Sequence, residues 1–257
     1  MSYTANFQRV EKKYLLNREQ WERMQPRLKE YMEPDAYGLT TIGNLYLDTQ
    51  EDLLVRRSIE KPKYKEKMRL RSYGIPGDED PVYLEIKKKT GGVVYKRRIA
   101  LTAREAMGYL TGGQPMPREG QIAREIDYMR KRYDLRPKVY LAYDRVAWKE
   151  LEPSRYDLRV TLDQNLRSRA AQVDLRLGDQ GALLLPSDQY LMEIKTQQAY
   201  PLWLSAALAQ AEAYPVSFSK YGRVYQQRAA DSLPKPACAR TRTQTVFGGY
   251  ANAFYPV

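Results

Sequence analysis

The stretch Lys67-Met68-Arg69-Leu70-Arg71 alternates three cations with two apolar residues, and this alternation decides how the chain is expected to fold. Successive side chains of a β-strand point to opposite faces, so the pattern predicts a strand with one charged and one apolar face. The segments Leu84-Glu85-Ile86-Lys87 and Leu191-Met192-Glu193-Ile194-Lys195 have the same form. Together the three segments predict a sheet that is apolar on one side and charged on the other.

Outside these segments the sequence mixes strand and helix signals. Strand-like alternation is found at 7–16, 43–48, 66–73, 82–89, 94–101, 138–148, 157–164 and 190–196. Helices are expected after the capping residue Asn17, from the capping box Thr102 with Glu105, over Ile122–Tyr133 and from Pro201. This order, with hairpin turns between strands, predicts an α+β fold. No period persists from residue 229, so we expect one domain over 1–228 and a flexible C-terminal tail over 229–257.

The composition limits the possible partners and chemistry. The 257 residues contain 43 Lys and Arg against 31 Asp and Glu, a formal charge of +12, which favours a polyanionic partner. There is no histidine and a single cysteine, Cys238, so histidine-based catalysis, Cys clusters and internal disulfides are excluded. A metal would need oxygen ligands, as Mg²⁺, Mn²⁺ and Ca²⁺ prefer. With no signal peptide or apolar membrane span in the sequence, we expect a soluble, cytoplasmic protein.

The charged faces have two interpretations. Further sets with the same spacing are Arg9, Glu11 and Lys13; Lys96 and Arg98; Tyr143 and Arg145; and Arg159, Thr161 and Asp163. A solvated outer sheet face is the commonest meaning of such alternation. Helices must pack on the apolar faces, however, so the charged faces of the strands are expected to face one another. Because a charged interior is costly unless water or a polyanion fills it, we expect a basic barrel that binds a phosphate chain with a divalent metal. A barrel of about eight strands is far too narrow for duplex DNA.

Several motifs resemble one known family in their order along the chain. They are Phe7–Leu15, Lys67–Arg71, Leu84–Lys87, Tyr95–Arg98, Tyr143–Arg145, Leu191–Lys195 and Ser219–Gly222. Together they resemble the catalytic domain of the vacuolar transporter chaperone (VTC) polyphosphate polymerases in its stand-alone bacterial form. That family belongs to the triphosphate tunnel metalloenzymes (CYTH superfamily), so the resemblance implies an eight-stranded antiparallel tunnel with helices outside. It also implies an ATP:polyphosphate phosphotransferase, which moves the γ-phosphate of ATP onto a growing polyphosphate chain with Mn²⁺ or Mg²⁺.

The resemblance implies roles for particular residues and partners. Six cations would act at the catalytic centre: Lys13, Arg69, Arg71, Lys87, Arg145 and Lys220. Phosphate would also be bound by Lys96, Arg98, Tyr143, Arg159, Lys195 and Ser219, with hydroxyl contacts from Tyr143 and Ser219. Glu193 would hold the metal, with support from Glu11 and Glu85. The implied partners are ATP, polyphosphate, and pyrophosphate or phosphate as primer, with no nucleic acid.

Two other functions stay open from the sequence. Tunnel triphosphatases usually begin with a Glu-x-Glu-x-Lys motif, whereas Arg9 occupies the first acidic position here. Fewer carboxylates favour phosphoryl transfer over hydrolysis by a metal-activated water. A triphosphatase or nucleoside triphosphatase nevertheless remains an alternative, as does a non-catalytic binder of polyphosphate or RNA. The opposite strand parity of Lys12 and Arg97 suggests them as negative controls.

Overall fold

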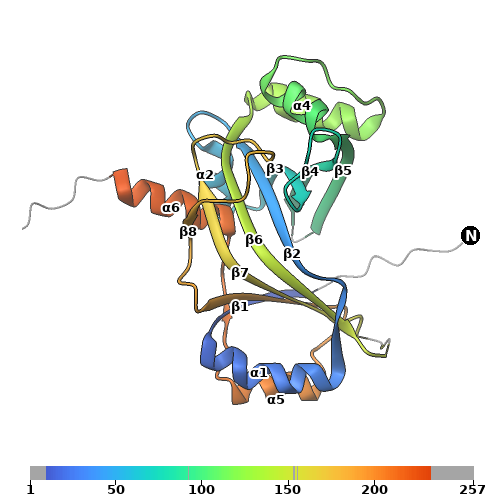
Figure 1. Cartoon of the computed structure of the whole chain (residues 1–257), viewed down its shortest axis with the longest axis vertical. Helices are drawn as coiled ribbons and strands as arrows, with labels where there is room; N and C mark the ends of the chain where they lie inside the picture. Colours follow the sequence, from blue (N-terminus) through green and yellow to red (C-terminus); the bar gives the residue numbers. More distant parts are fainter. Residues whose placement is uncertain (1–9, 92, 153, 155, 233–257) are drawn as a thin grey trace, which may run out of the picture.

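A computed structural model describes residues 10–91, 93–152, 154 and 156–232, and these form one antiparallel sheet with six helices around it (Figure 1). The strands follow the order β10-β1-β9-β7-β6-β2-β3-β4-β5, and β8 pairs with β7. Their bounds are β1 Val10–Asn17, β2 Met32–Asp48, β3 Tyr64–Tyr73, β4 Pro81–Thr90, β5 Val93–Thr102, β6 Arg136–Glu150, β7 Arg159–Arg169, β8 Ala182–Leu183, β9 Gln189–Thr196 and β10 Pro215–Val216. The predicted α+β class is confirmed.

The predicted eight-stranded closed barrel is wrong in two respects. Within the described chain the sheet has ten strands, because the short strands β8 and β10 add to the eight longer ones. The edge strands β5 and β10 are not paired with each other in that part of the chain, so the sheet is open. Two-residue strands leave no recognisable alternation in a sequence, which is why β8 and β10 were not predicted.

The helices are α1 Arg18–Tyr31, α2 Leu53–Ile59, α3 Ala103–Thr111, α4 Gln121–Tyr133, α5 Leu202–Gln210 and α6 Lys220–Ser232. Asn17 caps α1 and Thr102 caps α3, as predicted. The capping box of Thr102 with Glu105 was also predicted, and the structure adds one between Asn17 and Gln20. Helices α2 and α6 were not predicted. Residues 229–232 of the expected tail continue α6, and the rest of that segment lies outside the described residues. None of the described helices is long and apolar enough to cross a membrane.

Four of the described helices, α1, α3, α4 and α5, cover the apolar face of the sheet at its two ends. Figure 1 shows α4 at one end and α1 with α5 at the other. Beneath α3 and α4, the core contains Met68, Leu70 and Ile86, and beneath α1 and α5 it contains Met192 and Ile194. These five side chains are at most 1% exposed. The predicted apolar parity is therefore confirmed, and the alternate residues of the same strands face the other way.

Candidate active site

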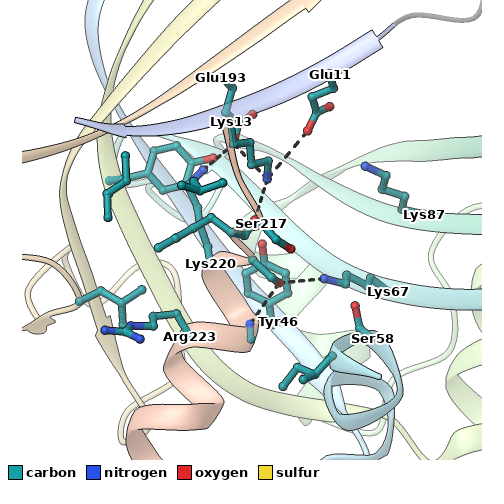
Figure 2. A pocket seen from close by; sticks show the side chains of 18 of the residues that line it. Glu11, Lys13, Tyr46, Ser58, Lys67, Lys87, Glu193, Ser217, Lys220 and Arg223 are labelled. Atoms are coloured by element: carbon teal, nitrogen blue, oxygen red, sulfur yellow. Dashed lines mark hydrogen bonds and ion pairs between the residues drawn. The ribbon is translucent and has the colours of Figure 1, made fainter. Parts of the chain in front are cut away.

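A cavity of about 1800 Å³ lies on the charged side of the sheet, with walls from β1, β3, β4 and β9 and from the start of α6 (Figure 2). Most of the predicted site residues line it: Glu11, Lys13, Arg69, Arg71, Glu85, Lys87, Lys96, Tyr143, Arg145, Glu193, Lys195, Ser219 and Lys220. The carboxylates in this set are Glu11, Glu85 and Glu193, and the cations far outnumber them. The cavity is thus strongly basic, as the parity of the strands predicts.

Strand register places opposite charges beside each other in part of this wall. Arg69 of β3 is directly across from Glu85 of β4, and the Arg69 Nη2–Glu85 Oε2 distance is 2.8 Å. Lys96 Nζ lies 2.8 Å from the other oxygen, Oε1. Glu85 is 2% exposed. Burial alone would raise its pKa, but Arg69, Arg71 and Lys96 together lower it, so the carboxylate stays ionised.

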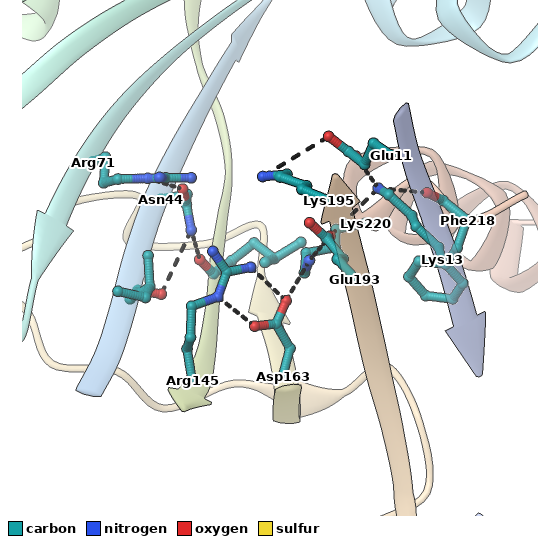
Figure 3. A network of polar contacts seen from close by, with 12 residues as sticks. Glu11, Lys13, Asn44, Arg71, Arg145, Asp163, Glu193, Lys195, Phe218 and Lys220 are labelled. Carbon is teal, nitrogen blue, oxygen red and sulfur yellow. Dashed lines mark hydrogen bonds and ion pairs between the residues drawn. The ribbon is translucent and has the colours of Figure 1, made fainter. Parts of the chain in front are cut away.

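A second network joins four strands and α6 (Figure 3). Arg145 of β6 faces Asp163 of β7 in register, and its Nε and Nη2 donate to the two carboxylate oxygens at 2.6 and 2.8 Å. Lys220 Nζ lies 2.6 Å from Asp163 Oδ2 and 2.9 Å from Glu193 Oε1. Lys13, across from Glu193 in register, places its Nζ 3.4 Å from the same oxygen. Three cations are thereby held around two buried carboxylates.

Both the carboxylates and the cations of this network are stabilised in their ionised forms. Burial opposes charge on Glu193, but Lys220, Lys13 and Arg145 lower its pKa far below the usual range. Burial also opposes charge on Lys220, yet Asp163 and Glu193 raise its pKa. Asp163, which is fully buried, was not among the predicted site residues. Its parity with Arg159 and Thr161 had placed it on the charged face, but no site role was predicted for it.

The start of α6 brings Lys220 into the network. Ser219 caps the helix: its carbonyl accepts from Arg223 N–H at 2.8 Å, and its Oγ accepts from Gly222 N–H at 3.2 Å. Lys67 Nζ donates to the same Oγ at 3.2 Å. The Ser219 hydroxyl is therefore engaged in the helix cap as well as lying at the cavity wall.

Two further groups on the wall, Tyr46 and Lys67, were not predicted as site residues. The hydroxyl of Tyr46, on β2, lies 3.5 Å from Arg69 Nη1, and the Tyr46 ring stacks on the ring of Tyr221. Burial would raise the Tyr46 pKa, but Arg69 and Lys67 lower it to about 8. The pKa of Lys67 is also lowered to about 8, chiefly by burial and then by neighbouring lysines. Lys67 belongs to the opening motif, but no pattern in the sequence pointed to Tyr46.

The positions of several predicted site residues differ from those expected from the sequence. Arg98 does not line the cavity, and its guanidinium lies 4.7 Å from the centre of the Tyr83 ring. Arg159 is also outside the cavity lining, with its side chain 63% exposed. Tyr143 lines the cavity through its ring, whose centre is 4.6 Å from Lys220 Nζ and 5.0 Å from the Arg145 guanidinium. Arg9 lies outside the described residues.

The two suggested controls also differ from each other. Lys12 contributes to the cavity lining, although its Nζ lies over the ring of Tyr200 at 5.6 Å. Arg97 pairs with Glu125 of α4, away from the cavity. Arg97 is therefore the better of the two controls.

The carboxylates of the cavity fit a metal that arrives with the substrate. No group of three or more acidic or thiol side chains suited to a metal lies in the described part of the chain. Glu85 is engaged by Arg69 and Lys96, and both lysine contacts to Glu193 are made at Oε1. One carboxylate together with substrate phosphates is a common way of binding Mg²⁺. The donor set therefore fits Glu193 as a single protein ligand and not a preformed cage, and the predicted metal role of Glu193 stays a prediction. Glu11 and Glu85, the predicted supporting ligands, are each paired with cations.

The fold and the site define a class of protein: an α+β fold with an open antiparallel sheet and a basic cavity on the charged side of that sheet. The model of the VTC domain family matches residues 8–228, and the chain belongs to that family. No curated protein matches the sequence.

Solved structures resemble the chain only distantly. A candidate adenylate cyclase from Bacillus halodurans is 15% identical, with a TM-score of 0.49 over 82% of this chain and 92% of that one. One from Vibrio parahaemolyticus is 10% identical, with a TM-score of 0.45 over 84% and 97%. A candidate adenylyl cyclase from Hippeastrum, described as having a dominant triphosphatase activity, is 14% identical, with a TM-score of 0.46 over 88% and 98%.

Proposed function

We propose that this protein synthesises polyphosphate, transferring the γ-phosphate of ATP to the end of a growing polyphosphate chain in the basic cavity. The observation that carries the proposal is the cluster of Lys13, Arg145 and Lys220, held at the cavity wall by Asp163 and Glu193. Membership of the VTC domain family supports the same activity.

The chemistry asks for positioning and charge neutralisation. In the transfer, a terminal oxygen of the acceptor forms a bond to the γ-phosphorus, the bond to the β–γ bridging oxygen breaks, and ADP leaves. Acceptor phosphate is already ionised near neutral pH, so no general base is needed, which agrees with the absence of histidine. Arg145 and Lys220 are held in place by Asp163 before substrate arrives, so little reorganisation is required when charge develops.

The other walls contribute to binding and orientation. Arg69 and Arg71 of β3 have planar guanidinium groups that match phosphate oxygens two at a time. Glu85 fixes Arg69 through Nε and Nη2, and Nη1, which lies 3.5 Å from the Tyr46 hydroxyl, is the nitrogen that can turn to an anion. A divalent metal held by Glu193 and phosphate oxygens would neutralise charge between the β- and γ-phosphates.

The experiment is incubation of the protein with ATP and Mn²⁺ or Mg²⁺, followed by separation of the products. Long-chain polyphosphate with an equivalent amount of ADP supports the proposal. Release of orthophosphate alone indicates a triphosphatase, and tight polyphosphate binding without turnover indicates a binding protein. Arg97→Gln, which removes a cation away from the cavity, serves as the control and is expected to keep the activity.

A further inference from the structure

The first turn of α6 is anchored to the sheet by a buried tyrosine next to Lys220. Tyr221, 2% exposed, donates through its hydroxyl to Asp48 Oδ2 at 3.1 Å. Its ring stacks on the ring of Tyr46, and the ring centroids are 4.7 Å apart. Asp48 and Tyr46 are two residues apart on β2, so they lie on the same face of that strand. A tyrosine makes the stacking contact and the hydrogen bond together, which a phenylalanine cannot do.

Asp48, the last residue of β2, is fully buried and holds α2 as well as α6. Its Oδ1 accepts from Thr49 N–H and Leu54 N–H, both at 2.8 Å. Its Oδ2 accepts from Val55 N–H at 2.9 Å. Asp52, the N-cap residue of α2, makes no capping hydrogen bond with its side chain, so Asp48 satisfies N–H groups of the first turn of that helix. One carboxylate therefore fastens both helices to the end of β2.

Helices α2 and α6 lie side by side (Figure 1). A Cβ atom at Gly222 would lie 3.4 Å from Ile59 Cγ1 of α2 and 3.1 Å from Ser219 Cβ, so the packing leaves no room for a larger residue there. The Tyr221 hydroxyl keeps its proton at neutral pH, because burial and the charge of Asp48 raise its pKa. The hydroxyl is therefore a permanent donor to the carboxylate.

Lys220 and Tyr221 fix α6 from two directions. Consecutive residues of an α-helix project about 100° apart around its axis. The Lys220 ammonium lies 2.6 Å from Asp163 of β7 and 2.9 Å from Glu193 of β9, whereas Tyr221 reaches Asp48 of β2. A rotation of the helix that moved the hydroxyl away from Asp48 would also move the ammonium. The position of Lys220 Nζ in the cavity thus depends on a hydrogen bond outside the cavity.

We propose that Asp48 and Tyr221 are positioning residues, which set the place of the Lys220 ammonium without touching the substrate. Neither residue lines the cavity. That the ammonium binds phosphate rests on the proposed function, whereas the link from Asp48 to Lys220 rests on the hydrogen bond and the helix geometry. Tyr221→Phe isolates this link, since it keeps the ring that stacks on Tyr46 and removes only the hydroxyl.

The test measures equilibrium binding of tripolyphosphate, without ATP, to the wild type, to Tyr221→Phe, to Lys220→Gln and to the double variant. Tyr221→Phe is expected to weaken binding roughly fivefold when Lys220 is present, as for residues coupled through one contact. In the Lys220→Gln background the same change should weaken binding less than about twofold. Lys13 and Arg145 remain in all four proteins, so the weaker affinities stay measurable.

Acetylation of Lys220 gives a second measurement, which needs no ligand. The side chain is buried and paired with two carboxylates, so a water-soluble acetylating reagent should modify it slowly in the wild type. Peptide mass spectrometry gives the rate at this lysine. In Tyr221→Phe the rate should rise roughly fivefold, because the lost hydrogen bond makes local opening of the helix start easier.

The matched control is Tyr109→Phe. Tyr109 of α3 is 1% exposed and donates to Asp127 of α4 at the same distance, 3.1 Å, outside the cavity. Both variants should lose a similar amount of thermal stability, roughly 2–6 °C in Tm. The control should nevertheless keep the wild-type affinity for tripolyphosphate and the slow acetylation of Lys220.

The proposal is overturned if Tyr221→Phe changes tripolyphosphate binding and Lys220 acetylation no more than Tyr109→Phe does. It is also overturned if Tyr221→Phe weakens binding equally with and without Lys220, because the hydroxyl would then act through another group. A wild type that binds no tripolyphosphate, or that makes no polyphosphate from ATP, would contradict the proposed function. The acetylation rate of Lys220 would still decide the role of Tyr221 in that case.

Discussion

Replacing Asp163 by Asn tests whether the buried carboxylate holds the cation cluster in place. The side chain is fully buried and accepts hydrogen bonds from Arg145 at 2.6 and 2.8 Å, and Lys220 Nζ lies at 2.6 Å. Removing one member of a buried ion pair costs about 3–5 kcal/mol. We expect about 3 kcal/mol, the lower end of that range, because Glu193 still contacts Lys220. At about 2–4 °C per kcal/mol, the Tm should fall by roughly 6–12 °C.

Activity should fall further than stability. The amide can accept from one guanidinium nitrogen, but its own N–H₂ faces the other, so Arg145 loses its orientation. Misplacement by about 1 Å can reduce catalysis roughly a hundredfold, which is the loss expected in synthesis at a temperature well below the Tm. The control is Asp144→Asn on the opposite face of β6, where Asp144 accepts from Arg167 at 3.1 Å outside the cavity. It should lower the Tm and leave synthesis per folded molecule intact.

The reasoning fails if Asp163→Asn keeps wild-type synthesis in the folded protein. It also fails if Asp144→Asn loses activity to the same extent, because the effect would then be a general consequence of removing a carboxylate that pairs with an arginine.

The other predictions concern the two faces of β3 and the pH dependence of binding. Arg69→Ala should abolish synthesis in the product assay at a cost of about 1–2 kcal/mol in urea unfolding, since a second cation still neutralises Glu85; full activity would show that the cavity is not the site. Met68→Ala, on the buried face, should cost about 2–5 kcal/mol in the same unfolding experiment and leave activity per folded molecule unchanged. Above about pH 8, Lys67 becomes neutral and Tyr46 anionic, so polyphosphate affinity in the wild type should fall between about pH 7 and pH 9, and less so in Lys67→Gln. The folded pKa of each group lies below its unfolded value, so these two groups should raise the free energy of unfolding from about pH 8 to pH 10; affinity independent of pH would contradict the assignment.

Most of the correct predictions of buried and cavity-lining residues came from the alternation of side chains along each strand. This alternation correctly separated Met68 and Ile86 from Arg69 and Glu85, because the period of two is a property of each strand alone. Parity does not say which length of a strand borders the cavity. Arg98 and Arg159 were therefore predicted as site residues, yet neither lines it.

Contacts between distant segments were beyond sequence reasoning. Lys220 was predicted as a cation of the site, but its burial between Asp163 and Glu193 depends on how α6 docks against β7 and β9. Tyr46 gains its low pKa from Arg69 and Lys67 on the neighbouring strand, which only the register reveals. The open edge of the sheet likewise depends on where β5 and β10 end relative to each other.

That open edge has a consequence for how a polymer can be loaded. In the described part of the chain no backbone ladder joins β5 to β10, so the wall contains a lengthwise seam. Edges without mutual hydrogen bonds can part without breaking a ladder, whereas a sealed tube must rupture one. A sealed tube accepts a strand only by its end. A wall with a seam also accepts a strand sideways, including one whose two ends are both attached to something larger.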